Sequence, residues 1–150
     1  MKLITIDFLP AEKKDQEFLY NLRRDTMKEY IEQKGGWVEE WQRKNSMLGK
    51  SFNPKGYFII TKSGEKIGCL GASITKRTMY LHHGMISPKF QGQGIFTYIM
   101  RKFISEGIKK EKDVVLQVLD INERARNLYS KLGFIVTGKM RAYFNMKYNK

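Results

Sequence analysis

The stretch Met85-Ile86-Ser87-Pro88-Lys89-Phe90-Gln91-Gly92-Gln93-Gly94-Ile95-Phe96-Thr97 carries most of the information about the fold. It joins the end of an apolar segment to a loop with two glycines, and then to a segment with helical spacing. Glycine lets backbone N–H groups approach a ligand with no Cβ in the way. The first turn of a helix adds unpaired N–H groups and the positive end of the helix dipole. The stretch therefore predicts a strand, an anion-binding loop and a helix; a tight glycine turn that binds nothing is the alternative.

The type of anion is narrowed by what surrounds this loop. Residues 95–100 contain no Asp or Glu, so the positive end of the expected helix is left open to an outside anion such as phosphate. No Lys follows Gly94, as the nucleotide P-loop would require, and no third glycine lies near Thr97, as the dinucleotide fingerprint would require. The loop is therefore expected to bind an anion of another class.

The segments on both sides of this stretch show alternating strand and helix patterns. The expected strands are 3–8, 57–61, 66–74, 79–86, 114–119, 134–139 and 143–148. The expected helices are 12–24, 27–33, 37–46, 95–109 and 122–131. Asp120 and Glu123 have the spacing of a capping box for the last helix, and Gly133 stands where a left-handed C-terminal cap belongs. The order β-α-α-β-β-β-α-β-α-β-β predicts a mixed α/β layer fold.

Length and composition restrict the class of protein. A chain of 150 residues with 41% hydrophobic residues has the size and composition of one globular domain, expected over 1–150. The single cysteine, Cys69, rules out an intramolecular disulfide framework, and with only the adjacent His82 and His83 no metal site is expected. No apolar run approaches the roughly 20 residues of a membrane span, and the N-terminus does not resemble a signal peptide. The expected location is the cytoplasm.

Positive charge is concentrated in the later part of the chain. Residues 1–54 carry 10 basic and 9 acidic side chains, whereas residues 55–150 carry 18 basic and 6 acidic side chains. Such a field attracts a polyanion, which is a nucleotide cofactor, a nucleic acid or an anionic surface. An ordinary solvated surface is the alternative interpretation of the same charges.

Two motifs resemble the GNAT superfamily of N-acetyltransferases. Gln91–Phe96 resembles the [Q/R]-x-x-G-x-[G/A] acyl-CoA signature of that superfamily. Asn122–Phe134 is similar to its N-x-x-A-x-x-L-Y-x-x-x-G-F segment, and one helix and one strand separate the two motifs as in the family. The final Gly/Ala of the signature is Phe96 here, a bulky residue that either narrows the phosphate cradle or points into the core. The whole element order is covered by the resemblance.

This resemblance implies a GNAT-like α/β fold. Its mixed central sheet has about six to seven strands flanked by about four helices, and acetyl-CoA lies in a cleft where the parallel strands 79–86 and 114–119 splay apart. The backbone near Met85 and Ile86 would bind the pantetheine arm. The N–H groups of the loop would hold the pyrophosphate; this set is Gln91, Gly92, Gln93, Gly94, Ile95 and Phe96. Further candidates for contacts to the cofactor are Lys89, Lys102, Asn122 and Arg126.

The implied reaction is direct transfer of the acetyl group from acetyl-CoA to a primary amine in a ternary complex. The amine must be neutral to attack the thioester, so a base or a water chain has to remove a proton. By resemblance Tyr129 is the general acid beside the sulfur. His82 is the candidate base, on a strand face expected to be shared by Tyr80, His82, Gly84 and Ile86, because imidazole titrates near neutral pH; water is the alternative.

The amine acceptor is the part that the sequence determines least. In the family the acceptor pocket forms from the first two helices and the closing strands. The candidate residues are Tyr30, Trp37, Trp41 and Tyr143, together with Phe52 and Phe144. Family members are often dimers, so the resemblance leaves both a monomer and a homodimer as alternatives. Two other interpretations remain: a non-catalytic acyl-CoA sensor, and a basic RNA- or ribosome-associated module, although no aromatic-and-basic nucleic-acid motif is evident.

Overall fold

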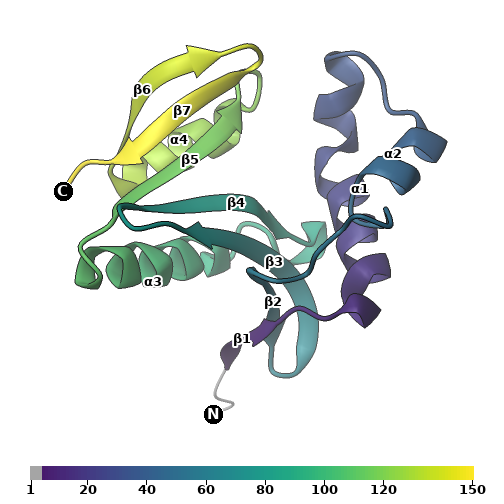
Figure 1. Cartoon of the computed structure of the whole chain (residues 1–150), viewed down its shortest axis with the longest axis horizontal. Helices are drawn as coiled ribbons and strands as arrows, with labels where there is room; N and C mark the ends of the chain where they lie inside the picture. The colour runs from purple at the N-terminus through teal and green to yellow at the C-terminus, as the bar shows by residue number, and fades with distance from the viewer. Residues whose placement is uncertain (1–4) are drawn as a thin grey trace. The chain divides into compact units, whose positions relative to one another are not determined.

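Seven strands form one hydrogen-bonded sheet in the order β1-β2-β3-β4-β5-β7-β6 in the computed structural model, which describes residues 5–150 (Figure 1). The expected mixed α/β class is confirmed, with the upper of the two strand numbers expected. The chain divides into two compact units. The first unit contains residues 5–71 and 83–91, and the second contains 72–82 and 92–150. We describe each unit by itself.

The first unit is built on an antiparallel meander. It contains β1 (Ile6–Pro10), a 3-10 turn η1 (Lys13–Asp15), α1 (Gln16–Gln33), α2 (Glu39–Asn45), β2 (Tyr57–Lys62), the first seven residues of β3 (Glu65–Ile74) and the 3-10 turn η2 (Pro88–Phe90). β1 pairs with β2, and β2 pairs with β3 across a short turn at Ser63 and Gly64. Both turn residues adopt positive φ angles of 49° and 86°, as a tight hairpin requires.

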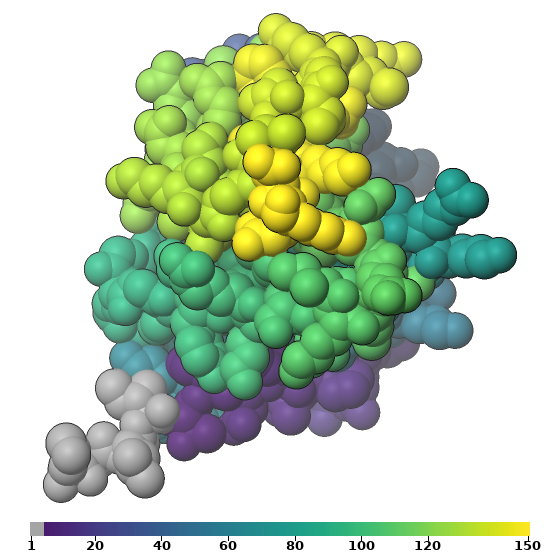
Figure 2. Space-filling model, turned by 90° about the vertical axis from the view of Figure 1, so that its left-hand side faces the viewer, coloured from purple at the N-terminus to yellow at the C-terminus, as the bar shows by residue number. Residues whose placement is uncertain are grey.

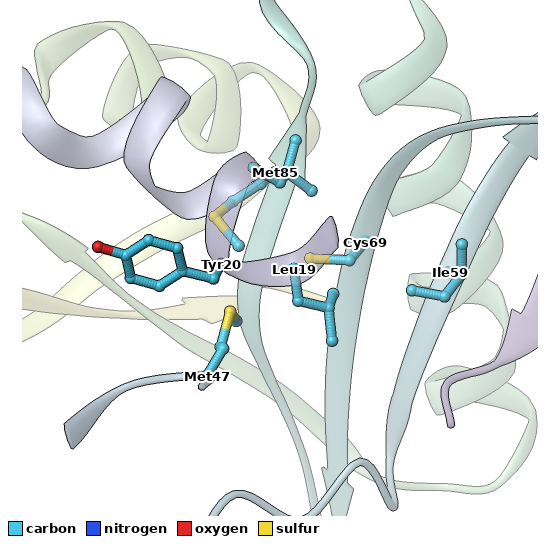
Figure 3. Packing of buried hydrophobic residues seen from close by; sticks show 7 residues of the cluster. Leu19, Tyr20, Met47, Ile59, Cys69 and Met85 are labelled. Atoms are coloured by element: carbon cyan, nitrogen blue, oxygen red, sulfur yellow. The ribbon is translucent and has the colours of Figure 1, made fainter. Parts of the chain in front are cut away.

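The core of the first unit joins α1 to the sheet strands (Figure 3). Its buried members are Leu19, Tyr20, Leu22, Met47, Ile59, Cys69 and Met85. The ring of Tyr20 is fully buried, and in Figure 3 its hydroxyl is directed away from Leu19 and Cys69. That hydroxyl donates a hydrogen bond to Glu39 Oε1 at 2.7 Å, so the polar end of the side chain is satisfied. Burial of each large apolar side chain contributes about 1.5–3 kcal/mol.

The second unit is built around a parallel strand pair and its crossover helix. It contains the first half of β4 (Thr78–Ile86), then α3 (Ile95–Lys109), β5 (Asp113–Leu119), α4 (Glu123–Leu132), β6 (Phe134–Met140) and β7 (Tyr143–Tyr148). β5, β7 and β6 are antiparallel neighbours, and α4 contacts β6 (Figure 1). Figure 2 shows the yellow C-terminal residues at the surface beside yellow-green β6.

The parallel pairing of β4 with β5 is short. It joins Thr78–Leu81 to Asp113–Leu116, although β4 continues to Ile86 and β5 to Leu119. Just beyond the last paired residue, His83 has a left-handed φ of 49°, which is uncommon for a residue other than glycine and interrupts strand alternation. The expectation that Tyr80 and His82 share one face with Gly84 and Ile86 therefore does not extend through His83.

Two sequence-based helix boundaries were wrong. Residues 12–24 and 27–33 do not form two helices, because α1 runs without a break from Gln16 to Gln33. Thr26 is accommodated inside α1, since its Oγ1 donates to the carbonyl of Leu22 at 2.8 Å. Trp37 was expected on one helix with Trp41, but α2 begins only at Glu39. Residues 3 and 4 of the expected first strand lie outside the described residues.

No helix within residues 5–150 has the length and apolar character needed to cross a membrane.

An ion pair between buried Asp15 and exposed Lys66 fixes the entry to α1. The Asp15 side chain is 5% exposed and accepts a bond from Lys66 Nζ at 2.8 Å and one from the Glu12 amide at 2.8 Å. Burial alone would raise the pKa of Asp15. The hydrogen bonds from Lys66 and from Glu12 outweigh it, so the pKa lies below its ordinary value of 3.8.

We predict that Asp15→Asn lowers the free energy of unfolding at pH 7 by about 1–3 kcal/mol. Because the folded-state pKa is lowered, this stabilisation is complete above the ordinary Asp value and is lost as the pH falls through the folded value. Urea unfolding at pH 7 and at pH 2.5 measures both effects. The exposed Asp25, 3.4 Å from Arg24 Nε, is the control, and Asp25→Asn should change stability by less than about 0.5 kcal/mol. An equal loss for Asp15→Asn at both pH values would contradict the prediction.

Candidate active site

The loop before α3 has the geometry of an anion cradle. Gly92 and Gly94 adopt left-handed φ angles of 77° and 79°, and a Cβ atom built on either would meet nothing within 4 Å. The amides of Gly92, Gly94, Ile95 and Phe96 have no backbone hydrogen-bond partner among the described residues. The first turn of α3 also carries no acidic residue. Open space, unpaired amides and the positive helix end therefore fit the phosphate groups of a cofactor.

Phe96 packs beside Tyr129, the candidate general acid. Their ring centroids are 6.3 Å apart, and the Tyr129 ring also meets Phe134 edge-on at 5.9 Å. Of the two expectations for Phe96, this packing favours a side chain that turns towards its neighbours in the second unit. α3 and α4, which carry the two rings, contact each other.

The environment of Tyr129 keeps its proton in place. Burial raises the pKa of Tyr129 to about 12, because the phenolate would lose its hydration. The neutral phenol is therefore the form present throughout the physiological range. A phenol that holds its proton, and has no hydrogen-bond partner among the described residues, can donate to a strong base that forms beside it, such as a thiolate.

The start of α4 differs from the expected capping box. Asn122, not Asp120, is the N-cap, and its Oδ1 accepts a bond from the Ala125 amide at 3.2 Å. Asp120 forms an ion pair with Lys139 at 3.3 Å instead. The helix begins at Glu123, one residue later than expected, and the Asp120 amide donates to the carbonyl of Ala142 in the β6–β7 turn. At the other end Gly133 is the left-handed cap, with φ 113°, as expected.

Four residues expected to contact the cofactor have partners within the protein. The Asn122 side chain caps α4, and the Arg126 guanidinium lies over the ring of Phe144 at 5.0 Å. The expected phosphate contact Lys89 forms an ion pair with Glu65 at 3.3 Å and lies over the Phe90 ring at 5.0 Å. Lys102 lies over the ring of Tyr98 at 5.7 Å. The cofactor roles of these four residues stay predictions.

The remaining candidates for the cofactor site belong to the first unit. Met85 and Ile86 are 4% and 5% exposed, and the Gln91 Nε2 atom donates to the Ile86 carbonyl at 2.8 Å. The Ser87 amide bonds the Ile67 carbonyl of β3 at 2.7 Å. Gln91 therefore holds the end of β4, and one lone pair of the Ile86 carbonyl is already used.

His82 lies in a small polar cluster of the second unit. Its Nε2 atom is 3.1 Å from Ser73 Oγ, and its ring stacks on Tyr80 with centroids 5.3 Å apart. Burial lowers the pKa of His82 from 6.5, because the imidazolium loses hydration. The ring is therefore neutral at pH 7, which is the protonation state a base needs. His83 is exposed and contacts a different residue, with Nδ1 3.2 Å from the Tyr57 hydroxyl.

The expected acceptor residues are found in different settings. Trp37 packs against Tyr20 with centroids 6.2 Å apart and donates to Glu39 Oε2 at 2.8 Å, which is a structural role. Trp41 on α2 is 58% exposed, and Tyr30 on α1 is half-buried. Tyr143 belongs to the second unit; burial raises the pKa of Tyr80, and an electrostatic interaction with Tyr143 adds to that rise.

Sequence reasoning missed a hollow of about 420 Å³ in the second unit. It is lined by Tyr80, Val115, Leu116, Gln117, Thr137, Asn145 and Met146. Gln117 stands out in the sequence as a polar residue inside the apolar segment 114–119. That signal could have drawn attention to it, but its partner Asn145 becomes its neighbour only through strand pairing.

No group of three or more His, Cys, Asp or Glu side chains among residues 5–150 is arranged to hold a metal ion.

The loop, α3, α4 and the parallel β4–β5 pair occur in the order that the family resemblance predicts. The family model of the GNAT acetyltransferases matches residues 17–134, which is most of the chain. The chain therefore belongs to the GNAT acetyltransferase family.

Individual relatives agree with this assignment. The chain is 40% identical to the thialysine N-epsilon-acetyltransferase of Mus musculus over 60 residues, which is 39% of this chain and about a third (35%) of that protein. The PaiA N-acetyltransferase of Thermoplasma acidophilum, crystallised with coenzyme A, superposes with a TM-score of 0.76 at 19% identity over 97% of this chain and 99% of that one. An acetyltransferase of Thermus thermophilus gives 0.74 at 19% identity over 98% and 97%. The two structural likenesses show the fold.

We predict that Asn122→Ala lowers the free energy of unfolding by about 1 kcal/mol, because the Ala125 amide loses its cap. Asn127→Ala is the control on the exposed side of the same helix, where alanine is the better helix former and stability should stay within about 0.5 kcal/mol or rise. Urea unfolding followed by circular dichroism measures both. The assignment of Asn122 as the N-cap would be refuted if Asn122→Ala and Asn127→Ala changed the free energy of unfolding by the same amount.

Proposed function

We propose that this protein transfers the acetyl group of acetyl-CoA to a primary amine. The observation that carries the proposal is the open glycine loop at the start of α3, which lies in the same unit as Tyr129 and His82. Family membership supports the reaction class, and the match over residues 17–134 supports the view that both units belong to one N-acetyltransferase domain. The loop amides of residues 92–96 would bind the pyrophosphate, and the positive end of α3 would favour its charge.

Each chemical step is assigned to a side chain whose protonation state suits it. Acetyl-CoA, when bound, supplies a thioester-activated acetyl group. His82, neutral at pH 7, takes the proton that the acceptor's ammonium must lose, either directly or through a water molecule. The amine nitrogen then forms the new C–N bond while the C–S bond breaks. Tyr129 gives its proton to the leaving sulfur, which is why its high pKa is useful.

Direct transfer is favoured over a covalent acetyl-enzyme. A covalent route needs an activated nucleophile, and a cysteine thiolate would be the obvious one. Cys69, the single cysteine, is fully buried, and burial raises its pKa to about 12. Its thiol donates to the His83 carbonyl at 3.1 Å and is therefore not available as a nucleophile. Acceptor and acetyl-CoA are thus expected to be bound together.

The name of the mouse relative suggests the first acceptor to test. That protein is a thialysine N-epsilon-acetyltransferase, so its name specifies a primary amine at the end of a flexible side chain of an amino acid. We propose a small-molecule amine of this kind as acceptor for the present chain. Binding of acetyl-CoA without turnover of thialysine, lysine or simple amines would favour the acyl-CoA sensor instead.

We predict that acetyl-CoA at 100 times its Kd stabilises the wild-type protein by about 2.7 kcal/mol. Gly94→Ala should raise the Kd at least ten-fold, since its Cβ would enter the cradle. Because position 94 has a left-handed φ, the Gly94→Ala variant should also lose about 1–2 kcal/mol of its free energy of unfolding.

The matched control is Gly64→Ala in the β2–β3 turn. Gly64 has a φ of 86° and equally open surroundings, so the variant carries the same strain away from the loop. Its stability should fall equally while its Kd for acetyl-CoA, measured by calorimetry at moderate salt, stays at the wild-type value. The proposed cofactor loop is wrong if the two variants bind acetyl-CoA equally well.

We predict that His82→Asn lowers kcat for thialysine at pH 7 by about 100-fold, as expected for loss of a general base. The wild-type kcat should fall as the pH drops through the lowered pKa of His82, below 6.5, because the imidazole becomes protonated. The His82→Asn variant should lack this acidic limb, and the control variant His83→Asn should retain it. If the pH–rate profile of His82→Asn is unchanged, His82 is not the base and water accepts the proton of the amine.

A further inference from the structure

The hollow of about 420 Å³ is crossed by a row of uncharged polar side chains from three neighbouring strands of the second unit. Tyr80 on β4 donates through its hydroxyl to Gln117 Oε1 on β5 at 3.4 Å. Gln117 Nε2 in turn donates to Asn145 Oδ1 on β7 at 2.8 Å. Gln117 and Asn145 are direct partners in the β5–β7 register, so the sheet itself holds the two amides together.

This row ends in a hydrogen-bond donor. The Oδ1 atom of Asn145 accepts one hydrogen bond from Gln117, and both N–H bonds of its Nδ2 atom remain available to a ligand. No side-chain hydrogen bond joins that Nδ2 to another residue of 5–150. A ligand that enters the hollow therefore meets an amide donor, and the complementary group is a carbonyl or carboxylate oxygen.

The charges near the hollow also favour a ligand oxygen over an ammonium group. All seven lining residues are uncharged, so neither an ammonium nor a carboxylate meets an opposite charge among them. The two N–H bonds of Asn145 Nδ2 then favour an oxygen acceptor over a second ammonium group, which can only donate. The neighbouring cation Lys147 pairs with Asp113 at 3.5 Å. The second unit as a whole carries more basic than acidic residues, which favours a ligand with negative charge.

We propose that this hollow binds the carboxylate or amide oxygen of an amino-acid-like acceptor, through Asn145 with Gln117 and Tyr80 behind it. The inference rests on the proposed acetyltransferase activity, because it assigns the part of the acceptor that does not react. Tyr80 connects the hollow to the proposed base, since its ring also stacks on His82. An acceptor anchored at Asn145 would thus be held beside that base, and diamines without an oxygen would be poor acceptors.

Binding is tested first and without turnover. The wild-type protein, labelled with ¹⁵N, is titrated with N-acetylglycine, which offers carboxylate and amide oxygens but no amine, and separately with putrescine. The side-chain NH₂ resonances of Asn145 are identified by their loss in Asn145→Ser. We expect them to shift saturably with N-acetylglycine alone, while the NH₂ resonances of Asn149, exposed just beyond β7, stay unmoved. The proposal is overturned if the Asn145 resonances do not shift when N-acetylglycine is added, or if they shift when putrescine is added.

Turnover is tested second, with two acceptors that share the reacting amine. These are thialysine and the diamine that remains when its carboxylate is removed. We expect the wild-type kcat/KM to be at least ten-fold higher for thialysine, and Asn145→Leu to reduce that value about ten-fold through KM while the diamine is unaffected. Asn149→Leu is the matched control and should behave as wild type.

The two tests separate the inference from the proposed function. Saturable binding at Asn145 with no acetylation of any amine supports the hollow and refutes the acetyltransferase proposal. Equal kcat/KM values for thialysine and the diamine in the wild type refute the hollow and leave the acetyltransferase in place. If neither of these two amines is a substrate but another amine is, the N-acetylglycine titration decides whether the hollow binds an oxygen ligand.

Discussion

The arrangement of the second unit depends on how closely α3 packs against β5. Gly107 of α3 is buried, and a Cβ atom there would clash with the side chain of Val114. With glycine at this point the helix can lie flat on the strand that follows it, while its other end begins at the glycine loop. A parallel strand pair needs such a crossover helix, so this contact fixes both the β4–β5 pair and the direction in which the α3 amides point.

Burial sets the chemistry of the site more than charge does. Tyr129 and His82 have no charged partner among the causes of their pKa shifts, and loss of hydration moves each towards its neutral form. A neutral imidazole and a neutral phenol are the two forms that acetyl transfer requires before the amine attacks. The same effect makes the Cys69 thiol inert. One physical cause therefore suits the proposed acid and the proposed base, and it makes a competing thiol nucleophile unreactive.

Short polar contacts hold the segments that the apolar core leaves exposed. Lys66 and the Glu12 amide bind Asp15 at the entry to α1, and Gln91 holds the carbonyl of Ile86 at the end of β4. In the second unit Asn122 caps α4, and Gln117 links β5 to Asn145 of β7. Each contact costs one or two side chains their conformational freedom, so such contacts are expected where the position of a loop or a strand end matters. Three of the four lie next to elements of the candidate site.

The sequence by itself determined the order of elements, the glycine loop and the family, because each depends on local spacing: strand alternation, helical period and two short motifs. Its assignment of Tyr129 as general acid stays a prediction. Local spacing was also misleading in two places. Residues 24–27 were predicted to separate two helices although α1 is continuous, and Asp120 with Glu123 matched a capping box although Asn122 is the N-cap. Only the tertiary structure decided that Phe96 packs beside Tyr129 and that Gln91 holds Ile86. It alone aligned Gln117 with Asn145, because that contact arises from strand pairing between residues 28 positions apart, which no local pattern encodes.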